Sequence, residues 1–133
     1  MTFNFAIPKL TPTNNVLLRM HWRDRRALNI EWFWLVKVAT QDLEIPRPAP
    51  LERRRLAIMS WRVQLADEDN FKGGLKPLLD ALVNAELIYD DGPRFLDQGA
   101  FQGRVGRRED EQTTIRLKLF RAGPIPKGGS HEE

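Results

Sequence analysis

Residues 56–82 change from a strand-like pattern to a helix-like pattern within a few positions, and this change limits the folds open to the chain. In "LAIMSWRVQLADED", apolar side chains occupy the odd positions from Ala57 to Leu65, which predicts a strand whose odd side faces the core. Leucines then recur at helical spacing between 75 and 82. A buried strand followed directly by an apolar helix indicates a domain that contains both kinds of element.

Further patterns complete the predicted fold. Alternating apolar residues predict strands near 2–8 and 112–121, and a weaker pattern allows one near 93–105. A run without Gly or Pro predicts a long helix over 24–43, with Asp24 as its cap. We therefore expect an α+β fold in which a small mixed β-sheet carries two main helices.

The chain length of 133 residues suits one domain, which we expect over 1–122. Residues 123–133 form a polar tail that we expect to be flexible. "TPTNN" at 11–15 predicts a turn, and the proline-rich residues 45–50 predict a rigid linker.

The start of the second helix is open to two interpretations. Either the helix runs from Asn70 with a bend, or "FKGG" is a loop and the helix begins near Leu75. In both cases Lys76 lies near the N-terminal end, four residues before Asp80 and on the same side of the helix.

Composition excludes several kinds of site. The chain has no cysteine and two histidines, so it offers no thiolate nucleophile and no zinc cage, and a bound metal would need oxygen ligands. No apolar run is long enough to span a membrane, and we expect a cytoplasmic protein without a small-molecule cofactor.

Charge is distributed unevenly along the chain. Residues 67–97 contain eight acidic and three basic residues, whereas the rest of the chain contains ten acidic and 18 basic residues. Arginines are grouped at 19–26, 53–55 and 104–108. A basic surround of this kind attracts polyanions, although each group alone can also be an ordinary solvated surface.

Two acidic residues follow the predicted strand at 56–66. If the alternation continues, Asp67 and Asp69 lie on the same side as the buried odd row, where carboxylates need a counter-charge such as a divalent cation. Alternatively the strand ends at Leu65, and residues 67–70 form a polar turn that caps the following helix.

Three segments together resemble the RusA family of Holliday junction resolvases, which are endonucleases of bacteria and phages. They are "DEDN" at 67–70, "GGLKPLLDALVNAELIYDD" at 73–91 and, more loosely, "TPTNN" at 11–15. The resemblance is strong over 61–95 and weak over the rest of 1–120. A D-x-D pair alone is common, but its order and spacing with the lysine, "DAL" and "DD" are specific.

The resemblance implies a homodimeric, magnesium-dependent endodeoxyribonuclease that cuts opposed strands of a four-way junction symmetrically. Its catalytic residues would be Asp67, Asp69, Asp91 and Lys76. With Asp90, the same three acids would bind one or two Mg²⁺ ions, for which Mn²⁺ can substitute. We expect branched DNA to contact basic side chains, namely Arg19, Arg23, Arg25, Arg26, Lys72, Arg107 and Arg108.

The chain departs from the family pattern in three places. "FKG" lengthens the segment before Lys76, so Lys72 competes for the role of the essential lysine, although the spacing to "DAL" favours Lys76. Asp90 and Asp91 compete for one acidic position, and the pattern favours Asp91. Glu86 stands where a glycine is usual, at the predicted end of the helix.

Other functions remain open. A calcium-binding loop at 67–78 fails because Lys72 replaces the required glycine and Leu78 the final glutamate. A DNA-binding module without catalysis, or a metal-dependent nuclease that acts on flaps or duplex, would also explain the basic surround. Three consecutive aromatic residues at 32–34 cannot all face one core, which makes a dimer contact plausible.

Overall fold

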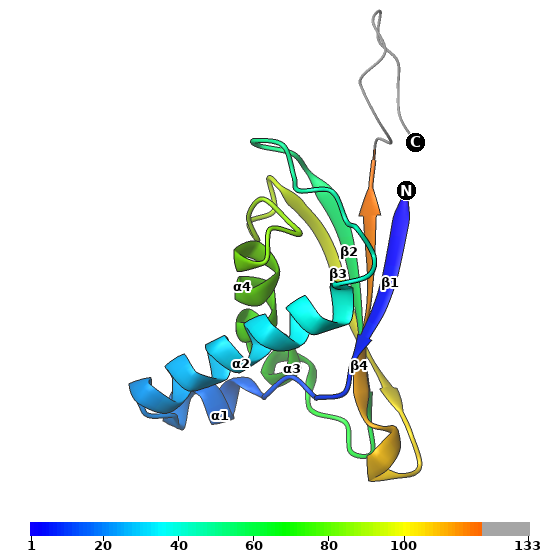
Figure 1. Cartoon of the computed structure of the whole chain (residues 1–133). Helices are drawn as coiled ribbons and strands as arrows, with labels where there is room; N and C mark the ends of the chain where they lie inside the picture. Colours follow the sequence, from blue (N-terminus) through cyan, green and yellow to red (C-terminus); the bar gives the residue numbers. More distant parts are fainter. Residues whose placement is uncertain (121–133) are drawn as a thin grey trace, which may run out of the picture.

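The structure, a computed structural model, describes residues 1–120. The chain forms a four-stranded mixed sheet with its helices on one side (Figure 1). The strands are β1 (Thr2–Ile7), β2 (Arg54–Arg62), β3 (Leu96–Arg104) and β4 (Gln112–Leu119). The predicted α+β class with a small mixed sheet is confirmed, whereas the predicted tail over 123–133 lies outside the described residues.

The sheet has the order β1-β4-β2-β3. β4 pairs antiparallel with both β1 and β2, while β2 and β3 run parallel. Two parallel strands need a crossover connection. The helices α3 (Glu68–Gly73) and α4 (Lys76–Asn84) supply it, so the acidic segment of the sequence lies within this crossover.

The two main helices are α2 (Trp22–Thr40) and α4, close to where the sequence predicts them. The second helical segment is two helices, α3 and α4, divided at Gly74 and Leu75. The main helix thus begins near Leu75, as one interpretation predicts, but most of "FKGG" is helical instead of a loop. The predicted cap of α2 is wrong. His21 caps this helix instead of Asp24, and its Nδ1 accepts a hydrogen bond from the Arg23 backbone N–H at 3.1 Å.

Two short helical elements are absent from the sequence prediction. The 3-10 helix η1 (Arg108–Asp110) precedes β4, and α1 (Asn14–Arg19) begins inside "TPTNN". The turn predicted there is wrong, because Thr13 is extended and Asn14 and Asn15 are helical. Thr13 caps α1 by accepting a hydrogen bond from the Val16 backbone N–H at 3.4 Å. A helix of six residues is too short for a periodic pattern to reveal it.

The core lies between the sheet and the helices α2 and α4. It is almost entirely apolar, and its fully buried side chains include Ile7, Trp32, Val36, Ile58, Leu78, Leu82 and Leu117. No helix among residues 1–120 is long and apolar enough to cross a membrane.

The predicted orientation of β2 is wrong. Leu56 and Ile58 on its even side are buried against the helices, whereas Ala57, Met59 and Trp61 on its odd side are only half-buried. Both sides of this strand are apolar, so alternation alone does not show which side the helices cover.

The expectation that two acids extend a buried row is also wrong. β2 ends at Arg62, and Asp67 is the N-cap of α3, with Asp69 in the first turn of that helix. Both side chains are exposed. The alternative is closer, since Asp67 stands at the N-cap position, but the strand ends three residues before Leu65 and residues 68–70 already belong to α3.

Candidate functional site

Lys76 lies between two carboxylates at the N-terminus of α4. Its Nζ is 2.8 Å from Oδ2 of Asp91 and 3.1 Å from Oδ1 of Asp80. Asp80 is one turn further along the same helix, as its spacing predicts. Asp91 belongs to the loop before β3, so its contact with Lys76 ties that loop to the start of α4.

The two carboxylates raise the pKa of Lys76 above its ordinary value, mainly through the hydrogen bond to Asp91 and then through the one to Asp80. The ammonium group is therefore charged at neutral pH. The Lys76 side chain is 54% exposed, so solvent screens both ion pairs and each stabilises the fold only weakly. The cluster therefore holds one charged, partly exposed ammonium group between two carboxylates.

A buried arginine holds the loop that carries Asp91. Arg54, which is 1% exposed, donates through Nη1 to the backbone carbonyl of Leu87 at 2.7 Å and through Nε to Glu52 at 2.8 Å. A buried charge without partners is costly, so these bonds fix the end of α4 to the start of β2. Just after α4, Glu86 has a φ of 62°, a left-handed conformation that favours glycine.

The other predicted acids are less closely connected to this cluster. The Asp67 carboxylate makes no capping hydrogen bond in α3, and Asp90 accepts a hydrogen bond from the backbone N–H of Asp91 at 2.9 Å. Within residues 1–120, no three His, Asp or Glu side chains are grouped closely enough to hold a metal ion. The structure thus brings Asp91 to Lys76 and does not gather Asp67, Asp69 and Asp91 into one group.

The N-terminal segment 11–15 packs against the glycines that precede Lys76. A Cβ on Gly74 would lie 1.7 Å from the carbonyl oxygen of Pro12, so the two backbones touch only because residue 74 is glycine. The Asn15 backbone N–H donates to Oδ1 of Asn70 at 2.8 Å. Segments 11–15, 67–70 and 73–91 are therefore neighbours, and α1 lies beside α3 in Figure 1.

A second buried arginine supports this contact. Arg62 is 6% exposed and donates through Nη2 to the backbone carbonyl of Thr11 at 2.7 Å and through Nε to Ser60 at 2.7 Å. Its guanidinium lies 5.5 Å from the centre of the Phe71 ring in α3. Burial lowers the pKa of Arg62, an effect that nearby Glu111 partly offsets.

Sequence reasoning missed the roles of Arg54 and Arg62. An arginine in a strand pattern ordinarily marks an exposed position, because its side chain is rarely buried without partners. The partners here are backbone carbonyls of residues 11 and 87, which no local sequence pattern places next to β2.

The basic residues predicted to bind DNA fall into two groups. Four are exposed on a basic arm, which we define as residues 19–26 at the end of α1 and the start of α2, and which projects away from the sheet in Figure 1. The other three lie close to acids: Lys72 is 3.5 Å from Glu68, Arg107 is 3.3 Å from Asp110, and Arg108 is 4.0 Å from Glu111. The basic arm is therefore the stronger candidate for phosphate contacts.

Comparison with known proteins gives no further guidance. No family model matches this chain, and no curated protein sequence matches it. Its function is therefore inferred from the residues of the site and from the resemblance of their sequence motif.

Proposed function

We propose that this chain is a RusA-like Holliday junction resolvase, a magnesium-dependent endodeoxyribonuclease that cuts paired strands of a four-way DNA junction. The contact between Lys76 and Asp91 carries the proposal, because it joins the lysine of the motif to its last acid at 2.8 Å. Segment 11–15 lies against the glycines of the same motif. The three segments that carry the resemblance thus share one surface.

The chemistry of the acidic residues suits magnesium, which prefers carboxylate oxygens. Asp90 and Asp91 would hold the ion together with Asp67 and Asp69, which would have to move toward them, because residues 1–120 do not group these acids closely enough for a metal ion. A bound ion would supply positive charge at the scissile phosphate and a more acidic water molecule. Lys76 would add a fixed positive charge at the phosphate, where charge develops during hydrolysis. In this scheme the ion pair with Asp80 orients Lys76.

The basic arm would bind the DNA backbone on either side of the cut. Its four arginines are exposed, and Arg23 also lies over the ring of Trp22 at 5.3 Å from the ring centre. Arginine binds phosphate oxygens in a bidentate manner and releases counterions from DNA. Binding through this arm should therefore weaken steeply as the salt concentration rises.

A homodimer is part of the proposal, because two equivalent strands of a junction require two equivalent sites. Among the three consecutive aromatics, Trp32 is buried in the core, whereas Trp34 is 59% exposed on the outer side of α2. Ile30 and Val38, one turn away on each side, are 50% and 62% exposed. This apolar stripe suits a second copy of the chain, and a cytoplasmic location completes the proposal.

The proposed activity is tested by comparing a labelled four-way junction with a linear duplex of the same sequence, with and without magnesium. We expect the junction alone to be cut, and only with magnesium. Asp91→Asn and Lys76→Met should each slow cutting by about 100-fold or more, as expected for groups that stabilise developing charge. Glu86→Gln is the matched control, since it removes an exposed ion pair with Arg47, 3.0 Å apart, outside the site.

Other outcomes would select the alternatives. Binding of both DNAs without any cutting in magnesium would identify a DNA-binding module. Equal cutting of junction and duplex would identify a general metal-dependent nuclease. A monomer at all concentrations in sedimentation experiments, with no change on Trp34→Glu, would contradict the proposed dimer contact.

A further inference from the structure

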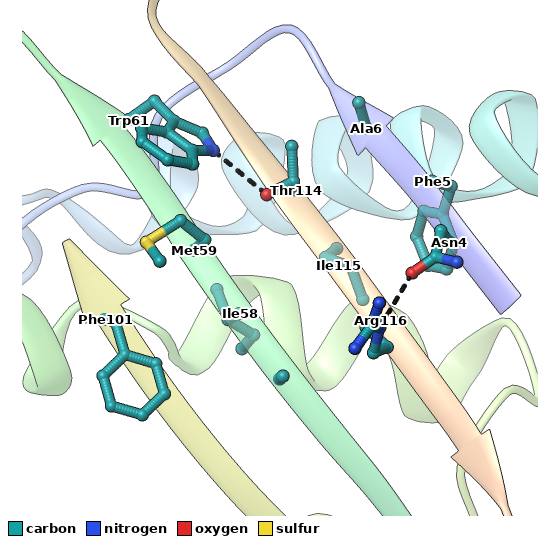
Figure 2. A pocket seen from close by; sticks show the side chains of 11 residues that line it. Asn4, Phe5, Ala6, Ile58, Met59, Trp61, Phe101, Thr114, Ile115 and Arg116 are labelled. Atoms are coloured by element: carbon teal, nitrogen blue, oxygen red, sulfur yellow. Dashed lines mark hydrogen bonds between the residues drawn. The ribbon is translucent and has the colours of Figure 1, made fainter. Parts of the chain in front are cut away.

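The side of the sheet that faces away from the helices is uncovered in residues 1–120. Parallel strands are normally covered on both sides, yet residues 1–120 leave one side of the parallel pair β2 and β3 uncovered. This open face forms a shallow hollow of about 570 Å³, shown in Figure 2. The register of the strands places Arg55, Met59, Trp61, Phe101, Arg116 and Lys118 on it.

Two aromatic rings lie against glycines of β3. A Cβ at Gly103 would be 2.6 Å from a ring carbon of Trp61, and a Cβ at Gly99 would be 3.2 Å from the ring of Phe101. Because neither glycine has a side chain, the two rings can pack closely against β3. In Figure 2, which looks onto the sheet, the Phe101 ring is seen nearly face-on.

The two rings differ in their hydrogen bonding and in their exposure to solvent. Trp61 donates from Nε1 to the Thr114 hydroxyl at 3.1 Å, which fixes its ring on the sheet. Phe101 is 58% exposed and stands beside Met59 in the register. A flat, exposed aromatic face on a rigid sheet is the arrangement on which proteins stack the bases of single-stranded nucleic acids.

The charges on the open face suit the same ligand. Arg55 is paired with Asp97 at 2.8 Å, which leaves Arg116 and Lys118 on the central strand β4 without an acidic partner in residues 1–120. The Nε of Arg116 donates to the Asn4 amide oxygen at 3.2 Å, which orients its guanidinium over the sheet (Figure 2). Trp61 and Phe101 lie toward one end of the face and Lys118 toward the other, with Arg116 between them, an order that matches the bases and phosphates of one strand.

A second copy of the chain fits this face less well. A two-fold axis presents the same surface to itself, so basic side chains on that surface face basic side chains unless acids lie among them. The open face has three basic residues and one acid, and Arg116 lies near its middle. Burying two copies of this unpaired charge together would be unfavourable.

We propose that the open face binds a short single-stranded DNA segment, with a base stacked on Phe101 and phosphates on Arg116 and Lys118. This inference adds a second DNA contact to the proposed nuclease. It concerns binding only, so it can be tested when the chain cuts nothing.

The test measures the anisotropy of a fluorescein-labelled eight-residue oligothymidylate in EDTA, where magnesium-dependent cutting cannot occur. Phe101→Leu keeps an apolar side chain but removes the ring, and we expect it to weaken binding about tenfold, as for the loss of one stacked base. Phe101→Trp should retain binding. Arg116→Gln should lower the slope of log K against log salt by about 0.7, the value for one phosphate of a single strand.

Two control variants leave the open face intact. Leu51→Ala removes an apolar side chain of equal exposure, and Arg47→Gln removes an exposed arginine elsewhere; neither should change binding. Equal affinity of wild type, Phe101→Leu and Arg116→Gln would overturn the inference. So would a dimer that dissociates on Phe101→Leu with unchanged affinity for the oligonucleotide, because a second copy would then occupy the face. Thermal melting of each variant confirms that it is folded.

Discussion

The helix-covered side of the sheet and its open side differ in how their polar groups are satisfied. On the covered side, Arg54 and Arg62 are buried and bonded to backbone carbonyls of distant loops. On the open side, Arg116 is exposed and has an amide oxygen as its partner. Charge near the core serves to position loops, and charge on the open side remains available to a ligand.

The same contrast applies to the glycines. Gly74, at the end of α3, allows one backbone to touch another, whereas Gly103 on the open side allows an aromatic ring to lie on a strand. A backbone contact cannot adjust, but a ring at a surface can swing away. Changes on the covered side should therefore cost more stability than equivalent changes on the open side.

The largest effect is expected from Glu52→Ala. It leaves the buried Arg54 guanidinium without its ion-pair partner, and breaking one side of such a pair costs about 3 kcal/mol or more. Arg54→Met keeps the volume and removes the charge, so it should cost about 1–2 kcal/mol, mainly for the unpaired Leu87 carbonyl. Urea denaturation of the two variants measures the difference. Equal losses would show that the unpaired buried charge is not the main cause of the lost stability.

Gly74→Ala comes next, with an expected loss of about 2–3 kcal/mol from overpacking. The new Cβ would meet the Pro12 carbonyl and force segment 11–15 away from α3. The free energy of unfolding measures this loss, and hydrogen exchange at Asn15 should increase because its bond to Asn70 is strained. A variant as stable as the wild type would show that the two backbones separate easily.

Gly103→Ala should cost less, about 1 kcal/mol, because the ring of Trp61 can move outward at the surface. Gly106→Ala is the control, since no atom lies within 4 Å of its added Cβ. Urea denaturation of the three alanine variants ranks them. If Gly103→Ala lost as much stability as Gly74→Ala, the two sides of the sheet would tolerate an added methyl group equally badly.

The smallest effect concerns Lys76 and pH. Its pKa is raised in the folded state, so its stabilisation is fully present below the ordinary lysine pKa of about 10.4 and is lost as the pH rises through the higher folded value. Lys76→Met should therefore lose less than about 1 kcal/mol at pH 7 and pH 9, and the difference from wild type should be smaller at pH 11.

Lys72→Met, which removes a similarly exposed ion pair within α3, is the control for this measurement. Denaturation at the three pH values gives the comparison. A difference for Lys76→Met that stays constant up to pH 11 would mean that the pairs with Asp80 and Asp91 contribute nothing to stability.

Much of the fold could be predicted from the sequence. All four strands and both main helices lie near their predicted positions, because period-two and helical patterns are local properties of the chain. The face of β2 that meets the helices could not be predicted, since Leu56 and Ile58 compete with Met59 and Trp61 on the opposite side.

The candidate site was predictable only in part. The spacing of Lys76 and Asp80 on one helix follows from the sequence, and their ion pair is present. The contact with Asp91 depends on where the following loop turns back, and that loop is held by Arg54 from another strand. The predicted metal-binding and catalytic roles of Asp67, Asp69, Asp90 and Asp91 stay predictions.

The sequence by itself determined the four strands, the two main helices, the acidic segment and its basic surround, because these depend on neighbours within a few residues. Only the tertiary structure decided which arginines are buried, which side of the sheet is open and which acid reaches Lys76. Those properties depend on contacts between residues far apart in the chain, such as Arg62 with Thr11 and Arg54 with Leu87. The physical reason is that burial and charge pairing are set by the packed neighbours of a side chain, and local patterns do not specify them.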